Sequence, residues 1–305
     1  MYPQLITFSS EGEQLEALLY LPEDREEPHP VVVMGGGWCY VKELVQPKYA
    51  EVFALFGLGS LIFDYRNFGG STGKPRQHLN PWGQWDDYRN AISLAERHPK
   101  LDNDRIAIWG ISYSGGHVLA VGALDPRVRA IVSVVPVIDG YENMRLAHGT
   151  LSLRRLNERV MSARRHLSET GNHSYIPHAL EDQTAEVPTW PFPSSEPMFK
   201  RLKDSQAPAY ENRTTVASVE MLLAYNVLPY ARRLNGTAAL IVLAEGDDHT
   251  HWDLALNAYN SIPNPDKRLY VVPRSTHHSI YEDDSQLHLA AESSATWLAE
   301  HFNLR

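Results

Sequence analysis

Three kinds of side chain that cooperate in acyl transfer occur in this sequence, and each follows a separate apolar run. Ser112 follows the first of these runs, Asp247 and Asp248 follow the second, and His277 and His278 follow the third. A serine hydroxyl is a weak nucleophile at neutral pH, so it needs a base, and the base needs an orienting group. A serine, an acid and a histidine in this order could supply those three roles.

The segment around Ser112 has the pattern of a sharp strand-to-helix turn. It reads GISYS (110–114), after an apolar run and before a segment of helical length. Small residues two positions before and after the serine leave room for such a turn, as in the G-x-S-x-G elbow, although Ser114 replaces the second glycine. A serine here could instead cap the helix. The acid and the histidine that follow favour the nucleophile.

Two neighbours of Ser112 are weaker candidates for the same chemistry. Ser114 is an alternative nucleophile, but it is expected in the first helical turn. His117 lies five residues after Ser112, about one and a half turns along a helix, and we expect it to pack rather than to act as the base.

The elements that must position these residues predict an α/β fold. Short, continuous apolar runs alternate with segments of helical length, as a buried parallel sheet requires. Two alternating segments at 5–9 and 14–21 precede them and predict an antiparallel pair with a turn at Glu11-Gly12. The other expected strands are 31–36, 60–65, 105–110, 129–137, 239–246 and 268–273, and the expected helices lie near 46–57, 84–98, 113–123, 252–261 and 284–302.

One long segment interrupts this alternation. Between 141 and 235 the sequence predicts helices near 151–167 and 218–234, the latter kinked at Pro229, and no strand. Such a segment cannot easily bury a core of its own. We therefore expect a core domain made of 1–140 and 236–305, with 141–235 forming a helical cap at the carboxyl edge of the sheet; a separate small domain is the alternative.

Composition and charge narrow the class of protein. The 305 residues carry a formal net charge of −9 with no Lys/Arg block, which argues against a nucleic-acid surface. The N-terminus lacks the pattern of a secretory signal, and no run of 18 apolar residues predicts a membrane span. The single cysteine, Cys39, allows no internal disulfide. We expect a cytoplasmic protein, and the sequence leaves a homodimer open.

With these features, the sequence resembles the α/β-hydrolase superfamily, and within it a group related to polyketide transferases and dienelactone hydrolases. The resemblance covers nearly the whole chain and is weakest over 141–217. It implies the α/β-hydrolase fold, with a mostly parallel sheet and helices on both faces. The stretches that carry it are 31–43, 63–92, 104–119, 218–234, 244–260 and 265–281.

The resemblance favours one acid and one histidine. The family's acid loop commonly reads D-x-x-T-P, which Asp247 fits through Thr250 better than Asp248 does. Its histidine loop reads G-x-H-x-x-x-Y, which His277 fits through Tyr281 and His278 does not. The resemblance therefore implies a Ser112–His277–Asp247 triad. A further acid, Asp139, is a weaker candidate that we expect to cap a helix.

Negative charge that develops on an acyl oxygen needs preorganised N–H donors. The first expected donor is the backbone N–H of Tyr113, directly after the nucleophile. The second is the backbone N–H of Trp38, in the loop after the strand 31–36. The family usually has His-Gly in this loop, where this chain has Gly36-Gly37.

Large side chains around the expected cap suggest a sizeable, mostly apolar acyl substrate. Neither a nucleotide fingerprint nor a metal triad with tight spacing is evident, so we expect no cofactor and no metal, although 247–251 contains potential ligands. The side chains expected to contact substrate are Tyr40, Trp82, Trp190, Met221 and Tyr225, with Trp38 and Phe192 nearby.

Three functions fit these residues. The first is a serine hydrolase of esters, thioesters or lactones that works through an acyl-enzyme. The second is an acyltransferase or polyketide-processing enzyme with the same triad, including hydrolysis of a carbon–carbon bond beside a ketone. The third is a receptor that keeps the fold and the triad without turnover. We favour the hydrolase, acting on a small-molecule acyl substrate.

Overall fold

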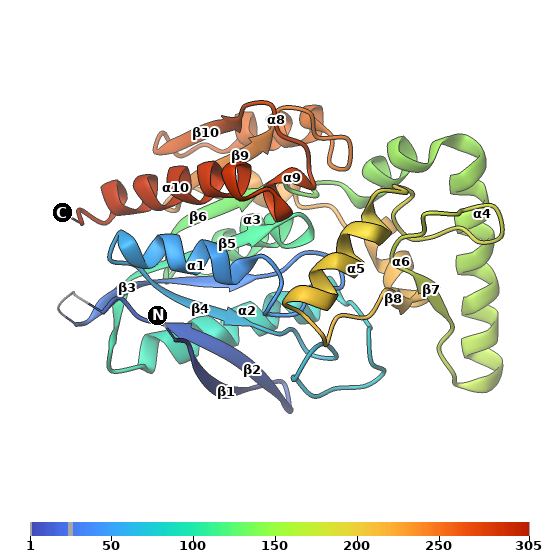
Figure 1. Cartoon of the computed structure of the whole chain (residues 1–305), viewed down its shortest axis with the longest axis horizontal. Coiled ribbons are helices and arrows are strands. Elements are labelled where there is room, and N and C mark those ends of the chain that lie inside the picture. The colour runs from blue at the N-terminus through green and yellow to red at the C-terminus, as the bar shows by residue number, and fades with distance from the viewer. Residues whose placement is uncertain (1, 24–26, 305) are drawn as a thin grey trace.

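The computed structural model describes residues 2–23 and 27–304 of the chain. An eight-stranded sheet has the order β1-β2-β4-β3-β5-β6-β9-β10 (Figure 1). The pairs β1–β2 and β2–β4 are antiparallel, and the remaining pairs are parallel. The strands are β1 (Gln4–Ser10), β2 (Glu13–Tyr20), β3 (His29–Gly35), β4 (Gly59–Phe63), β5 (Leu101–Ile111), β6 (Val128–Val134), β9 (Ala238–Ala244) and β10 (Lys267–Val272).

The apolar pattern of the strands explains this arrangement. Every residue of β3, β4 and β9 is buried, as expected for parallel strands covered on both faces. The first hairpin turns at Glu11 and Gly12, which have φ values of 47° and 88° and so provide the left-handed conformations of a tight turn. The predicted α/β architecture is thus confirmed.

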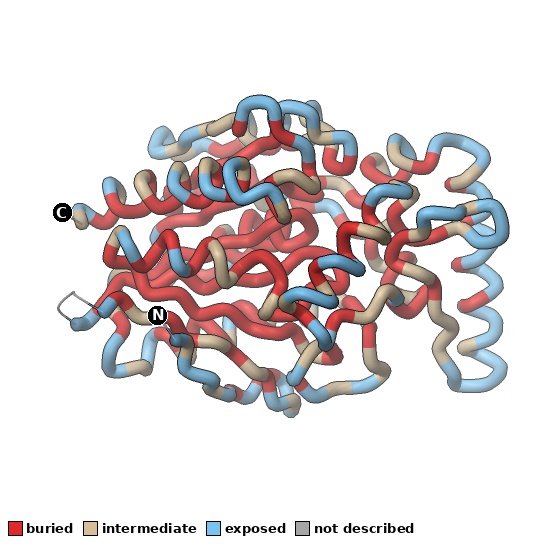
Figure 2. Tube along the Cα trace, in the orientation of Figure 1, coloured by how far each residue is buried: buried red, intermediate tan, exposed pale blue. Residues whose placement is uncertain are grey.

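Helices cover both faces of the sheet. Helices α1 and α10 pack together on one face, and α2 and α3 pack together on the other (Figure 1). The buried residues accordingly concentrate along the sheet and the inner sides of these helices (Figure 2). The helices of this part are α1 (Gln46–Leu55), α2 (Pro81–Arg97), α3 (Tyr113–Leu124), α8 (Trp252–Ser261), α9 (Ser279–Glu282) and α10 (Asp284–His301).

The chain between β6 and β9 forms a group of elements at one end of the sheet, on the right in Figure 1. The expectation that it contains no strand is wrong, because β7 and β8 form an antiparallel pair. Strands of three residues are too short to produce an alternating pattern in the sequence. The elements are α4 (Gly140–Thr170), β7 (Tyr175–Pro177), α5 (Ser195–Ser205), β8 (Arg213–Thr215), α6 (Val216–Leu223) and α7 (Leu228–Ala231).

Two helices of this segment differ from the sequence-based expectation. Helix α4 begins eleven residues before the predicted start at 151 and is interrupted at Gly149, whose φ of 64° is not helical. The single kinked helix expected over 218–234 is instead two short helices, α6 and α7, because the chain leaves the helical conformation before Pro229. Within the described ranges, no helix is both long enough and apolar enough to cross a membrane.

Candidate active site

Ser112 lies on the sharp turn between β5 and α3. Its φ of 55° and ψ of −113° are unusual for a residue with a side chain, and surrounding contacts must hold it there. Its N–H donates to the Val134 carbonyl at 2.8 Å, and its own carbonyl accepts from the Val137 N–H at 3.0 Å. A Cβ at Gly110 would lie 2.1 Å from the Ser114 carbonyl oxygen, so this turn requires glycine at 110.

Ser114 is a structural tether rather than only a small residue. Its buried hydroxyl lies 2.6 Å from the Tyr65 hydroxyl and donates to the Gly36 carbonyl. It therefore joins the turn at Ser112 to the loop after β3. The sequence pattern indicated for Ser114 a space-leaving role or an alternative nucleophile, and nothing in the local sequence indicates a partner 78 residues away.

Asp247 follows β9 and is oriented by three donors of its own loop. Its Oδ1 accepts from the backbone N–H groups of His249 and Thr250, each at 2.9 Å, and its Oδ2 accepts from the Thr250 hydroxyl at 2.9 Å. Burial acts to raise the pKa of Asp247, but the charge of His277 and the hydrogen bonds from His277 and Thr250 outweigh it and lower that pKa. The structure therefore keeps this carboxylate ionised.

His277 follows β10 and contacts Asp247 directly. Its Nδ1 lies 2.9 Å from Asp247 Oδ2, and the two side chains are 4% and 1% exposed. Of the two aspartates, only Asp247 is in this position: Asp248 is 70% exposed and contacts His249 Nδ1 at 2.5 Å. The structure thus brings together the acid and the histidine that the resemblance favoured.

His278 has different surroundings. Its Nε2 lies 3.0 Å from the Ser195 hydroxyl at the start of α5. Burial lowers the pKa of His278 to about 2, so its ring is neutral at ordinary pH. This histidine contacts the inserted segment instead of an orienting carboxylate.

The second ring nitrogen of His277, Nε2, contacts a tyrosine. The Tyr281 hydroxyl lies 2.6 Å from His277 Nε2, and Tyr281 is buried on the one-turn helix α9. Burial raises the pKa of Tyr281. In the sequence, Tyr281 served only to favour His277 over His278. In the structure its phenol contacts His277 and lines the same cavity as Ser112.

The loop after β3 lies against the nucleophile turn. A Cβ at Gly37 would be 3.3 Å from Ser112 Cβ and 3.4 Å from the Ile111 carbonyl oxygen. The rings of Trp38 and Tyr113 meet edge to face at 5.0 Å between centroids. Among the described residues, the backbone N–H groups of Trp38 and Tyr113 have no hydrogen-bond acceptor. Both predicted donors are therefore close to Ser112 and available.

A small cavity lies beside Ser112. Its volume of about 20 Å³ holds roughly one water molecule, whereas pockets for drug-sized ligands usually measure about 300–1,000 Å³. The inserted segment contributes Trp190 and residues of α5 to its lining. A substrate therefore requires these elements to move. The lining residues are Trp38, Tyr40, Ser112, His178, Trp190, Ser195, Phe199, His249, His277, His278 and Tyr281.

Several residues that the sequence predicted as substrate contacts do not line this cavity. Trp82 is 46% exposed at the start of α2. Met221 lies on α6, and Tyr225 is buried with its hydroxyl 2.8 Å from His117 Nδ1. Of the five expected substrate contacts, the structure brings only Tyr40 and Trp190 to the cavity.

Two titratable residues near the site have structural contacts instead. His117 is buried, and its two ring nitrogens contact Tyr225 and Gln84 at 2.8 and 3.0 Å. Burial lowers its pKa to about 3, so His117 is a neutral core residue. Asp139 accepts from the Glu142 N–H at 3.0 Å and caps α4, as expected.

Donor atoms of Asp247, Asp248 and His249 lie within 4.8 Å of one another, a spacing that a metal ion could use. Both oxygens of Asp247 already accept hydrogen bonds from His277 or from its own loop. The remaining two side chains bond each other through Asp248 Oδ1 and His249 Nδ1. These contacts orient the loop and His277.

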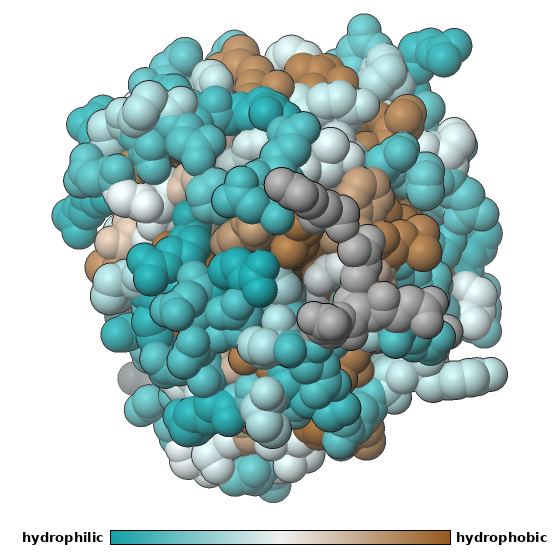
Figure 3. All heavy atoms as spheres, turned by 90° about the vertical axis from the view of Figure 1, so that its left-hand side faces the viewer, coloured by the Kyte–Doolittle hydropathy of each residue, from teal (hydrophilic) through white to brown (hydrophobic). Residues whose placement is uncertain are grey.

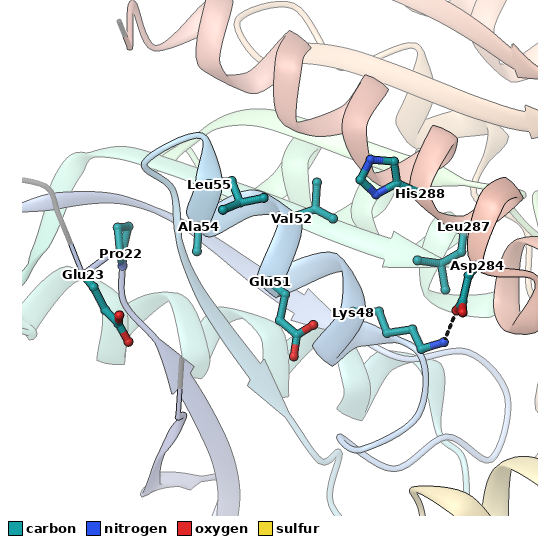
Figure 4. Close-up of a pocket in the computed structure, with 10 residues that line it drawn as sticks. All are labelled: Pro22, Glu23, Lys48, Glu51, Val52, Ala54, Leu55, Asp284, Leu287 and His288. Carbon is teal, nitrogen blue, oxygen red and sulfur yellow. Dashed lines mark hydrogen bonds and ion pairs between the residues drawn. The ribbon is translucent and has the colours of Figure 1, made fainter.

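A larger cavity lies elsewhere on the molecule. It is a groove of about 820 Å³ between α1 and α10, where Lys48 and Asp284 form an ion pair (Figure 4). The face of the molecule turned away from the inserted segment is mostly hydrophilic, with scattered hydrophobic patches (Figure 3). The described residues that line this groove include no serine, threonine or cysteine, so Ser112 stays the candidate nucleophile.

Comparison with known proteins agrees with this fold. The family described as X-Pro dipeptidyl-peptidase (S15 family) matches residues 11–279. The chain belongs to this family.

The relatives of this S15-family chain include a thiohydrolase and a polyketide transferase. It is 29% identical over 284 residues to the thiohydrolase aneE of Aspergillus aculeatus, covering 90% of this chain and 86% of that protein. It is 27% identical over 236 residues to the polyketide transferase grgF of a Penicillium species, covering 77% of each. The crystal structure of the α/β hydrolase GrgF from Penicillium sp. sh18 superposes with a TM-score of 0.82 at 24% identity, covering 99% of both chains. The S15-family chain is an enzyme of the α/β-hydrolase kind.

Proposed function

We propose that this chain is a serine hydrolase that cleaves esters, thioesters or lactones of mostly apolar acids through an acyl-enzyme. The observation that carries the proposal is the ionised Asp247 holding His277 beside the strained turn that presents Ser112. Such an arrangement activates a hydroxyl that would otherwise be a poor nucleophile.

In the proposed mechanism, the Ser112 oxygen attacks the carbonyl carbon while its proton moves to His277. Asp247 accepts from Nδ1–H, which leaves Nε2 free to receive a proton and stabilises the imidazolium that forms. The tetrahedral oxyanion accepts hydrogen bonds from the N–H groups of Trp38 and Tyr113. It then collapses, the leaving group takes the proton from His277, and water later releases the acid.

The lining of the cavity favours a neutral acyl substrate over a peptide with a free amino terminus. A dipeptidyl-peptidase substrate carries a charged ammonium group, which a buried site binds well only with a counter-charge. None of the described residues lining the cavity is an aspartate or glutamate. Aromatic rings and neutral histidines suit an uncharged acyl chain better, and the thiohydrolase relative supports a thioester.

Acyl transfer is the second candidate. The cavity beside Ser112 has room for about one water molecule, so few waters compete there with an acyl acceptor. A polyketide-type carbanion or alcohol bound in its place would accept the acyl group, with the same three residues. The polyketide transferase relative supports this alternative.

The proposal is tested by labelling and turnover together. A fluorophosphonate probe should label the wild-type chain but not Ser112→Ala, and only the wild type should turn over a panel of p-nitrophenyl esters, thioesters, lactones and diketones. Equal labelling of both chains would remove Ser112 as the nucleophile. A drop in free acid when an alcohol or amine acceptor is added would favour transfer over hydrolysis.

We also propose that residues 141–235 act as a cap over the site and that the enzyme works in the cytoplasm on a small-molecule substrate. Contacts between α5 and the histidine loop support the cap, and the unpaired buried Cys39 is compatible with a reducing compartment. A homodimer remains a prediction, which sedimentation of the purified chain tests.

A further inference from the structure

The Tyr281 hydroxyl occupies the place where the base would meet the nucleophile. It lies 2.6 Å from His277 Nε2, the nitrogen on the far side of the ring from Asp247. It also lines the same small cavity as Ser112. The described residues include no direct hydrogen bond between Ser112 and His277. The Tyr281 phenol, rather than the Ser112 hydroxyl, therefore occupies the hydrogen-bonding position of Nε2.

The position of this phenol is built into the fold. Tyr281 follows His277 by four residues, and its N–H donates to the His278 carbonyl at 2.9 Å, which begins the turn of α9. Its ring packs edge to face against Tyr40, with 5.8 Å between centroids, and only 2% of the residue is exposed. The hydrogen bond to His277, the packing against Tyr40 and the burial fix the phenol in one position.

We propose that Tyr281 is a catalytic residue that relays the proton of Ser112 to His277 during acylation. This inference rests on the proposed serine-hydrolase function and adds a fourth residue to it.

The relay balances in protons and electrons. As the Ser112 oxygen forms its bond to the carbonyl carbon, its O–H bond breaks and the proton passes to the Tyr281 oxygen. The phenol's own proton passes to His277 Nε2, so the tyrosine ends with one proton, as it began. When the intermediate collapses, the imidazolium proton returns through the phenol to the leaving group. Because burial raises the pKa of Tyr281, the phenol stays neutral and transfers protons without ionising.

The first test removes only the hydroxyl. Tyr281→Phe should fold. The rate of acylation by a p-nitrophenyl ester, measured as the pre-steady-state burst, should fall by about 10- to 100-fold. This loss is at or below the rate enhancement that a positioned general acid or base usually gives. The matched control is Tyr49→Phe, which removes an equally buried hydroxyl with no partner among the described residues. Its burst should match the wild type.

The second measurement separates a relay from a packing role. The solvent isotope effect on acylation, followed across mixtures of light and heavy water, should indicate one moving proton fewer in Tyr281→Phe than in the wild type. Replacing Tyr281 with a fluorinated tyrosine of lower phenol pKa keeps the ring, and it should move the alkaline limit of the acylation rate to lower pH. A tyrosine that only packs would leave both measurements unchanged.

The outcomes distinguish this inference from the function on which it rests. Turnover that persists in Ser112→Ala would overturn the serine-hydrolase proposal. Turnover that needs Ser112, together with a Tyr281→Phe burst within about twofold of wild type and an unchanged isotope effect, would overturn the relay alone. If Tyr281→Phe does not fold, the fluorinated variant decides, because an unshifted pH profile would refute the relay.

Discussion

Replacing Asp247 by asparagine should reverse the hydrogen bonding of His277 while keeping the shape of the site. Oδ1 of Asp247 accepts from two backbone N–H groups, those of His249 and Thr250. An asparagine must place its carbonyl oxygen there, since an NH₂ group would meet two donors. Its NH₂ group then takes the position of Oδ2, which faces His277 Nδ1 at 2.9 Å.

This orientation disables the base. His277 Nδ1 lies nearer to the Oδ2 position, at 2.9 Å, than to Oδ1, at 3.1 Å, so it should accept from the asparagine NH₂ group. The proton of the neutral imidazole then moves to Nε2, which can no longer take a proton from the nucleophile. The negative charge that stabilises the imidazolium is also lost. The corresponding change in a serine protease lowers kcat by about 10⁴-fold, which is about 5 kcal/mol of transition-state stabilisation.

The assay is the burst and steady-state turnover of a p-nitrophenyl ester by Asp247→Asn and by its neighbour Asp248→Asn. Asp248 is 70% exposed and contacts His249, so its replacement should change kcat by less than about threefold. Near-wild-type turnover in Asp247→Asn, or an equally large loss in Asp248→Asn, would refute the assignment of the acid. Unfolding by urea checks that both variants are folded.

Three further predictions concern the stability of the fold. Gly110→Ala should lower the free energy of unfolding by about 1–3 kcal/mol or more, because the new Cβ would meet the Ser114 carbonyl. The control is Gly236→Ala, where a Cβ has open space and the free energy of unfolding should change little. Urea titration compares the two variants. Ser114→Gly should also destabilise the chain in urea, by about 1–3 kcal/mol, because Tyr65 and the Gly36 carbonyl lose a buried partner; a more stable variant would contradict the tether. Burial lowers the pKa of His178 to about 3, below the unfolded value of about 6.5. The unfolded state then binds the extra proton, so the contribution of His178 is complete above about pH 6.5 and falls by about 1.4 kcal/mol per unit below it. Unfolding at a series of pH values should give a smaller slope for His178→Gln than for the wild type.

The sequence predicted the core of the fold because that core is encoded locally. Continuous apolar runs mark strands such as β3 and β9, and their alternation with helices leaves few arrangements of the sheet. The candidate site was predicted only in part, since Trp82, Met221 and Tyr225 do not line the cavity. Ser112 lies on a strand-to-helix turn, and the spacings to Thr250 and Tyr281 chose Asp247 and His277 from their neighbours.

The remaining features depend on contacts between distant segments. The β7–β8 pair has three residues in each strand, and the tether from Ser114 joins residues 78 positions apart. Met221 lies on α6, and its placement away from the cavity depends on how α4 to α7 pack, whereas Trp82 lies exposed at the start of α2; no periodicity determines either placement. The hydrogen bond between Tyr281 and His277 follows from a single helical turn, α9, whose sequence only gave the spacing.

The central claim is that Ser112 carries the acyl group. Mass measurement of the intact chain, quenched during turnover of a p-nitrophenyl ester, tests it most directly, with peptide mapping to locate any adduct. We expect the wild type to carry one acyl adduct, on the peptide that contains Ser112. Ser112→Ala should show neither an adduct nor a burst. An adduct on another residue, or continued turnover by Ser112→Ala, would contradict it.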